Sequence, residues 1–351
     1  MNNKIAIALV FALIVAIALP ITVQAGTIRV ITTTSDIASI AKKVGGKLVE
    51  VQSLNDGTRD PHFLQAKPTY IMKARKADLF IRIGMELEIG YEPVILNSCR
   101  NRNIQVGKDG HLDLSINTVK LEVPTMKIDR SMGDVHPMGN PHYWLDPYNG
   151  RIMAQDITQR LIKLDPKNKK TYTQNLAAFK KRLDEAMFGK KAVETIGGDD
   201  LWKVLIEGTI DKHLKEKKIE SAGWYGLLLP YKGKGIVSQH RSWNYLLNRF
   251  GLKLAIEMES KPGVPPSPRH LKKVVETVKA EKVQAIIVEP FYGTKAADFV
   301  ASRTNATVIV CANAVGGQPQ ASDYIAMLDN AIQSLAKALQ KNTEGKAGGK
   351  S

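Results

Sequence analysis

The sequence has few cysteines and, after its first 25 residues, no long apolar run. Its 351 residues include only two cysteines, Cys99 and Cys311, and a structural zinc site of the usual kind needs more ligands than two thiols supply. No later segment approaches the roughly 18 apolar residues that a membrane-spanning helix needs. These absences exclude a cysteine-only zinc centre and favour a mature chain that is soluble.

The first 25 residues have the layout of a secretory signal peptide. Lys4 gives a weakly positive start, an apolar run ends at Pro20, and "VQA" places Ala25 before the expected cleavage point. An uncleaved anchor is the alternative, although the run is short for a membrane span. No cysteine lies near the cleavage point, so lipidation is not expected there. We therefore predict an exported, periplasmic protein.

The two cysteines leave two arrangements open. In an oxidising compartment Cys99 and Cys311 can form a disulfide. The alternative, two separate buried thiols, is equally compatible with the sequence.

Acidic residues are fewer than basic ones. The chain has 50 lysines and arginines against 34 acidic residues, a formal net charge of +16. Such a charge can indicate nucleic acid or an anionic surface as a partner. Here the basic residues are spread along the chain and no nucleic-acid-binding motif accompanies them. The pattern favours solvated helix faces, with a specific polyanion site as the alternative and no nucleic acid as a partner.

Strand-like and helix-like segments alternate along the chain, which predicts an α/β fold with mainly parallel sheets flanked by helices. The rhythm occurs twice, before and after a long helical region, so we expect two lobes. The predicted strands are "TIRVITTT" (27–34), "LVEVQSL" (48–54), "DLFIRIG" (78–84), "GIVSQH" (235–240), "LKLAIEME" (252–259), "VQAIIVEP" (283–290) and "TVIVCA" (307–312).

The predicted helix over 167–188 is long and has a charged face, which suits a connector between the lobes. The segment around 189–233 is an expected insertion with one helix near 200–217, and the polar end of the chain is an expected disordered tail. The predicted boundaries are 1–25 for the signal peptide, 26–165 for the N-terminal lobe, 166–190 for the linking helix, 191–340 for the C-terminal lobe and 341–351 for the tail.

Three histidines follow strands or open helices in this pattern. They are His62 in "RDPHF", His142 in "GNPHYW" and His240 in "GIVSQH". Ligands of open α/β sheets bind beyond the carboxyl ends of the strands, so histidines from both lobes can meet in the cleft between them. Pro61 and Pro141 precede two of the rings and restrict the backbone there. We predict a shared metal site.

Three neutral imidazoles suit a borderline ion such as Zn²⁺, whereas Mn²⁺ prefers oxygen-rich ligand sets and is less favoured. Glu289, at the end of "VQAIIVEP", is the predicted fourth metal-binding residue, either as a ligand or by orienting one. Asp60 and water are the other options for the fourth position.

The remaining histidines have simpler interpretations. His111, His213 and His270 are expected to be ordinary surface residues, and His136 is expected to lie near the mouth of the cleft, outside the primary ligand set. Tyr143 and Trp144 are expected in a lobe core.

The histidine-bearing stretches, taken together, resemble the metal-binding solute-binding proteins of ABC transporters, the zinc/manganese cluster called A-I. The resemblance covers most of residues 27–340. It rests on "DPHFLQAKPTYIMKARKADLFIRIGMELE", "NPHYWLDP", "SQHRSWNYLLNRFGLK" and "VQAIIVEPFYGTKAADFVASRTNATVIV". Histidine in the third stretch is typical of zinc members, whereas manganese members often have glutamate there.

The resemblance implies two lobes joined by a rigid long helix, with the metal bound between them. It implies a non-enzymatic monomer that captures zinc with high affinity and delivers it to an ABC permease. Three departures stand out: the histidine-rich acidic loop of many zinc members is missing, "CANAVGGQP" has no carboxylate where manganese members place an aspartate, and the segment 189–233 is extra sequence.

Three other functions remain open at this point. A secreted zinc hydrolase could use the same three histidines, with Glu289 as general base, although the sequence has no HExxH motif. A binding protein for a metal chelate or haem is the second alternative, and an adhesin-like surface protein is the third.

Overall fold

The computed structural model describes residues 27–125 and 136–344. The predicted signal peptide and the last residues of the predicted tail lie outside these ranges. The last helix continues to Glu344, past the expected start of the tail. Within the described ranges, no helix combines the length and the apolar character needed to cross a membrane.

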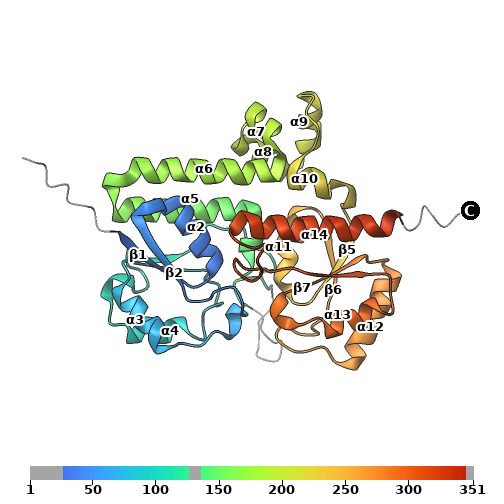
Figure 1. Cartoon of the computed structure of the whole chain (residues 1–351), viewed down its shortest axis with the longest axis horizontal. Helices are drawn as coiled ribbons and strands as arrows, with labels where there is room; N and C mark the ends of the chain where they lie inside the picture. The colour runs from blue at the N-terminus through green and yellow to red at the C-terminus, as the bar shows by residue number, and fades with distance from the viewer. Residues whose placement is uncertain (1–26, 126–135, 345–351) are drawn as a thin grey trace, which may run out of the picture.

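Two separate four-stranded sheets, all of whose strand pairs are parallel, form the cores of two lobes (Figure 1). The strand order is β2-β1-β3-β4 in the first sheet and β6-β5-β7-β8 in the second. The predicted α/β fold class with two lobes is therefore confirmed. The strands are β1 (Ile28–Thr32), β2 (Val49–Ser53), β3 (Leu79–Arg82), β4 (His111–Asp113), β5 (Gly235–Ser238), β6 (Lys253–Glu257), β7 (Ala285–Val288) and β8 (Thr307–Val310).

The central strands are apolar because helices cover both faces of each sheet. All four residues of β7 are buried, as are the first three of β3, and continuous apolar runs are typical of such strands. The flanking helices are α2 (Ser35–Gly45), α3 (Pro68–Lys76) and α4 (Glu92–Ser98) in the first lobe, and α11 (Asn244–Arg249), α12 (Pro268–Ala280), α13 (Lys295–Ala301) and α14 (Tyr324–Glu344) in the second.

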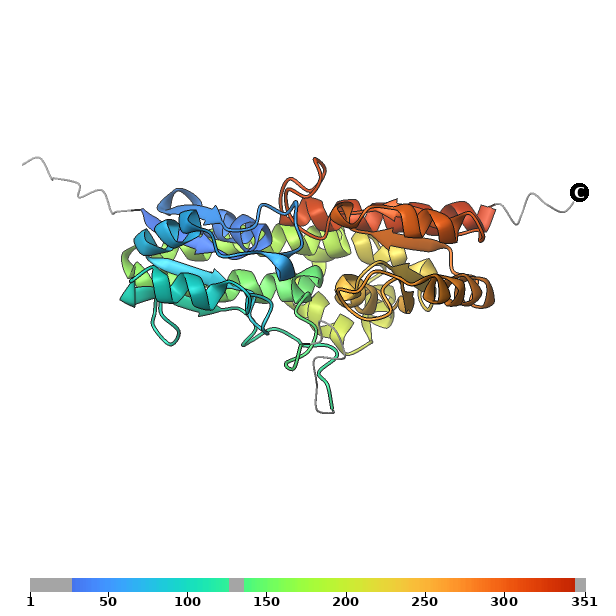
Figure 2. The same ribbon diagram turned by 90° about the horizontal axis from the view of Figure 1, so that it is seen from below.

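Two long helices lead from the first lobe to the second. Helix α5 (Pro147–Leu164) packs against α2, and α6 (Lys169–Phe188) runs back along α5 and then contacts α10 (Gly223–Leu228) at the second lobe. Figure 1 shows α6 above the first lobe, with α14 beside its far end. The helix predicted over 167–188 is thus the one that joins the lobes. Seen from below, the two lobes lie side by side (Figure 2).

The segment after α6 differs from the single helix expected near 200–217. It contains α7 (Lys190–Ile196), α8 (Gly198–Ile206) and α9 (Ile210–Glu216), which stand above α6 in Figure 1. Gly197 and Gly208 separate these helices with φ angles of +94° and +71°. Glycine adopts such angles readily, so each of the two glycines ends one helix and lets the chain turn into the next.

Cys99 and Cys311 are both buried free thiols. Cys99 belongs to an apolar cluster in the first lobe, whereas Cys311 follows β8 in the second. Because the two residues lie in different lobe cores, the structure selects two buried thiols over a disulfide.

The loop after β8 fixes the two lobes against each other. The indole Nε1 of Trp144 donates to the carbonyl of Asn313 at 2.8 Å, and the backbone N–H of Val315 donates to Asp36 at 2.9 Å. Gly57, on the loop that leads to His62, lies against the same segment: a Cβ at Gly57 would stand 2.2 Å from the carbonyl oxygen of Val315. The loop that carries a predicted ligand is therefore packed on the opposite lobe.

This close approach makes Gly57→Ala a test of the interface between the lobes. Gly57 has a φ of +87° and Gly107 one of +85°, but a Cβ at Gly107 would meet nothing within 4 Å. Both substitutions place alanine in a conformation that costs about 1–2 kcal/mol. Only Gly57→Ala adds a steric clash, worth about 1–3 kcal/mol. Urea denaturation of the metal-free proteins should show Gly57→Ala as the less stable variant, and equal stabilities would contradict the contact.

Candidate metal centre

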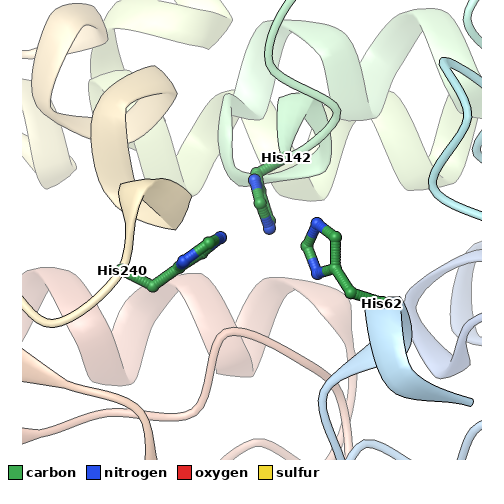
Figure 3. A group of neighbouring side chains, drawn as sticks. All are labelled: His62, His142 and His240. Carbon is green, nitrogen blue, oxygen red and sulfur yellow. The ribbon is translucent and has the colours of Figure 1, made fainter. Parts of the chain in front are cut away.

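Three histidines that are far apart in sequence converge between the lobes. The ring centroids of His62, His142 and His240 lie 5.1 to 5.4 Å from one another. One potential ligand atom of each lies within 4.8 Å of the other two. All three residues have buried side chains. The exposed fraction is 3% for His62 and His142 and 5% for His240. The histidines predicted as metal ligands therefore share one small space (Figure 3).

A short 3₁₀ turn accompanies each ring. His62 lies within the turn Pro61–Phe63, whereas His142 and His240 immediately precede the turns Tyr143–Leu145 and Arg241–Trp243. His240 lies two residues beyond β5, as the rule for parallel sheets predicts. His142 differs, because it stands at the entrance to α5 rather than at a strand end.

His62 and His142 share a local sequence motif, Asx-Pro-His. The side-chain oxygen of Asp60 accepts hydrogen bonds from both the backbone N–H and the ring Nδ1 of His62, at 2.9 and 2.7 Å. Asn140 does the same for His142, at 3.0 and 2.8 Å. Proline between them restricts the backbone, so each short segment fixes its own ring.

His240 is fixed differently, by a residue of the neighbouring strand connection. Its Nδ1 lies 2.8 Å from Oε2 of Glu259, which follows β6. Each of the three Nδ1 atoms thus faces an oxygen. A carboxylate can only accept a hydrogen bond, so Asp60 and Glu259 place the ring proton on Nδ1 and make Nε2 the electron-pair donor. Figure 3 shows the second nitrogen of each ring directed toward the shared space.

The orientation of the Asn140 amide follows from its other contacts. Its Nδ2 donates to a carboxylate oxygen of Glu122 at 2.9 Å and to the carbonyl of Arg241 at 2.8 Å. The amide oxygen must then be the atom that faces His142, which gives this ring the same tautomer as the other two.

Burial and neighbouring charges set the proton affinities at the site. Burial lowers the pKa of His142 well below the ordinary histidine value, and the nearby histidines lower it further. Burial acts in the same direction on His240, but the hydrogen bond that its Nδ1 donates to Glu259, together with the charge of Glu259, outweighs burial and raises the pKa. Burial raises the pKa of Asp60, yet hydrogen bonds from His62 and Tyr292 prevail and bring it to about 2. Asp60 is thus an anion that orients His62.

Glu289, the fourth predicted metal-binding residue, is completely buried at the end of β7. Its Oε1 accepts a hydrogen bond from the Ser242 hydroxyl at 2.5 Å, and burial raises its pKa to about 7. Within the described part of the chain, its Oε2 has no hydrogen-bond partner, and the group of mutually close ligand atoms consists of the three histidines without Glu289. Its part in metal binding stays a prediction.

A pocket opens above the three rings. His136, Glu122, Arg241 and Pro262 are among its lining residues, and the ring of His136 lies 5.3 Å from that of His62. His136 therefore lines the same pocket beside His62, and its expected place at the mouth stays a prediction.

Two other expectations have opposite outcomes. His111 is buried and its Nε2 lies 3.0 Å from a carboxylate oxygen of Glu92, so the expectation of a surface residue is wrong. Tyr143 and Trp144 are buried core residues, as expected. Asn140 and Glu259 were missed as positioning residues. The repeated Asx-Pro-His motif and a carboxylate just after a strand were the signals for them.

The sequence around this site matches a known protein family. The family model described as "Zinc-uptake complex component A periplasmic", ZnuA, matches residues 30–188 and 227–338. The chain belongs to this family. The match passes over 189–226, the segment that contains α7, α8 and α9.

Similar proteins agree with this assignment. The metal ABC transporter substrate-binding lipoprotein SsaB of Streptococcus sanguinis is 25% identical over 318 residues, 90% of each chain. The manganese ABC transporter substrate-binding lipoprotein PsaA of Streptococcus pneumoniae is 25% identical over 317 residues, 90% of this chain and 89% of that one. A crystal structure of ZnuA superposes with a TM-score of 0.65 at 22% identity, covering 89% of this chain and 98% of that one.

Family membership confirms the resemblance found in the sequence. The chain is the substrate-binding component of a metal ABC importer, and the family consists of solute-binding proteins rather than enzymes. The three-histidine group accordingly holds a divalent metal as cargo. The hydrolase alternative is thereby set aside.

Metal affinity should decrease as the pH is lowered, because a protonated histidine cannot bind the ion. The raised pKa of His240 keeps this ligand protonated up to a higher pH than an ordinary histidine. Glu259→Gln removes the charge that raises this pKa. The pH at which half of the affinity is lost should therefore move downward. Titrations against a chromophoric chelator at a series of pH values measure this midpoint.

The control for this prediction is Glu276→Gln, which removes an exposed carboxylate on α12. Its pH midpoint should equal that of the unaltered protein. A midpoint that stays constant in Glu259→Gln would contradict the proposed effect of Glu259 on His240.

Proposed function

We propose that this protein binds zinc with high affinity in the periplasm and passes it to the membrane permease of an ABC importer. The observation that carries the proposal is the donor set: three imidazole nitrogens within 4.8 Å of one another, grouped without a carboxylate oxygen in the described chain. Zn²⁺ is commonly held by histidine nitrogens at about 2.0–2.1 Å.

The donor set also argues for zinc over manganese. Mn²⁺ prefers carboxylate, carbonyl and water oxygens, whereas imidazole suits Zn²⁺. The relatives differ in the metal that their names give: PsaA is named for manganese, and the matching family model for zinc. An identity of 25% does not show that two proteins bind the same metal. The support for zinc here is therefore the ligand chemistry.

Charge balance supports a dication in this place. A divalent ion would bring two positive charges into a buried space, which is costly without nearby anions. The Asp60 and Glu259 carboxylates each lie behind one histidine, within hydrogen-bond distance of its Nδ1. We propose that Glu289 supplies a third negative charge and the fourth contact, since a bound cation favours its ionised form.

Export follows from the predicted signal peptide over 1–25, and delivery from the importer family. The protein would act as a monomer whose partners are the metal ion and the permease. A competition titration of Zn²⁺ against Mn²⁺, Fe²⁺ and Cu²⁺ tests the choice of metal. Stronger binding of Mn²⁺ than of Zn²⁺ would overturn the proposal.

His142→Ala and His240→Ala should each weaken zinc binding by more than about 100-fold. The loss of a direct ligand must exceed the 10–100-fold usual for residues behind the ligands. His213→Ala, in α9, is the control and should leave the affinity unchanged. Calorimetry gives the affinities, and thermal unfolding of the metal-free variants verifies that they are folded. Unaltered zinc affinity in a folded His142→Ala or His240→Ala variant would show that the metal binds elsewhere.

Glu289→Gln tests the fourth contact separately. Glutamine keeps the shape of the side chain and can still accept the Ser242 hydrogen bond, but it removes the negative charge. Zinc affinity should fall about ten-fold or more, measured by chelator competition beside Glu276→Gln. If the two variants bind zinc equally well, Glu289 takes no part in the site.

A further inference from the structure

The three histidines differ in which lobe holds them in place. His240 belongs to the second lobe, and its partner Glu259 belongs to that lobe as well. Glu259 is held there by a backbone hydrogen bond from Gly263 at 2.9 Å. His62 belongs to the first lobe, but its partner Asp60 also accepts a hydrogen bond across the cleft, from the hydroxyl of Tyr292 at 2.6 Å. The orientation of His62 therefore involves both lobes.

The two oxygens of Asp60 divide these contacts between them. Oδ1 accepts from the backbone N–H and the ring of His62, and Oδ2 accepts from Tyr292. A carboxylate held at one oxygen can still rotate, whereas one held at both oxygens has a fixed plane. The Tyr292 hydroxyl thus completes the restraint on the group that orients the His62 ring.

The position of Tyr292 is itself well defined. It ends the 3₁₀ turn Pro290–Tyr292, directly after Glu289, and its backbone N–H donates to the Glu289 carbonyl at 3.1 Å. Gly293 follows with a φ of +73°, which lets the chain turn away. The Tyr292 ring lies 6.2 Å from that of His240. The side chain therefore reaches from the second lobe, beside one ligand, to the anchor of another.

We propose that Tyr292 is a cross-lobe positioning residue for the metal site, acting on His62 through Asp60. This inference rests on the proposed function. The second lobe, by this arrangement, controls the direction of a ligand that belongs to the first. Correct apposition of the lobes then completes the three-histidine geometry. Separation of the lobes withdraws Tyr292 and loosens His62, while His240 keeps its own partner Glu259.

Tyr292→Phe removes only the hydroxyl and keeps the ring. Zinc Kd should rise about 10–100-fold, the range usual for a group behind a ligand, with faster dissociation as the main cause. Tyr225→Phe is a matched control, because the Tyr225 hydroxyl also donates to a carboxylate, that of Asp211, at 2.6 Å in the extra helical segment. This control should keep the zinc Kd of the unaltered protein.

A double-mutant cycle distinguishes positioning from general structural support. In an Asp60→Ala background the hydroxyl has no anchor to hold, so Tyr292→Phe should add less than about two-fold to Kd, because additivity fails for residues that act through each other. Stopped-flow chelation gives the dissociation rates, and the absorption spectrum of the Co²⁺-loaded protein reports the ligand geometry, which should change in Tyr292→Phe and not in Tyr225→Phe.

Two results would overturn the positioning role while leaving the proposed function intact. One is an unaltered zinc Kd in Tyr292→Phe; the other is a loss of the same size with and without Asp60. Failure of the unaltered protein to bind zinc would overturn the proposed function and this inference together.

Discussion

The metal site depends on one repeated interaction, the hydrogen bond between each histidine Nδ1 and an oxygen behind it. Asp60, Asn140 and Glu259 supply these oxygens. Each bond fixes the plane of a ring and directs Nε2 into the space between the lobes. Without such partners, no interaction would orient the electron pairs of the three buried imidazoles toward one point. The surrounding loops and turns serve to place the oxygens.

The fold extends this restraint from single residues to whole lobes. The loop of His62 packs against the segment after β8, with Gly57 in backbone contact with Val315. Trp144, next but one to His142, donates to the carbonyl of Asn313 in the same segment. The lobes are thus fixed against each other by backbone and side-chain contacts close to the ligands, and helix α6 runs above the first lobe to contact α10 at the second. A site made by both lobes needs such a rigid frame, because a small shift between them displaces one ligand relative to the others.

The sequence was sufficient for the parts of the fold that local patterns determine. Short β-branched runs identified seven of the strands, and an uninterrupted charged pattern identified α6. The edge strand β4 was missed because three residues, His111–Asp113, carry no periodic signal. The single helix expected near 200–217 corresponds to α8 and α9, which are divided at Gly208 by its positive φ, and α7 was missed.

The candidate site was predictable in its ligands but not in their supports. His62 and His240 follow the carboxyl ends of parallel strands, and the Pro-His pairs indicated His62 and His142. Glu259 comes near His240 only because β6 pairs with β5, which is a tertiary fact. His111 looked like a surface residue because its partner Glu92 lies 19 residues away along the chain. Contacts of this kind depend on packing that no local pattern encodes.

The separate burial of Cys99 and Cys311 has a consequence for how the chain must mature. In an oxidising compartment, two thiols that meet in an unfolded chain are readily joined. Such a crosslink would tie together residues that belong to two different lobe interiors, and neither interior could then close. In such a compartment, folding would therefore have to outpace oxidation. Once Cys311 is enclosed, burial raises its pKa to about 11, so little of the reactive thiolate remains. A disulfide in a purified sample would accordingly mark molecules that never reached the native state.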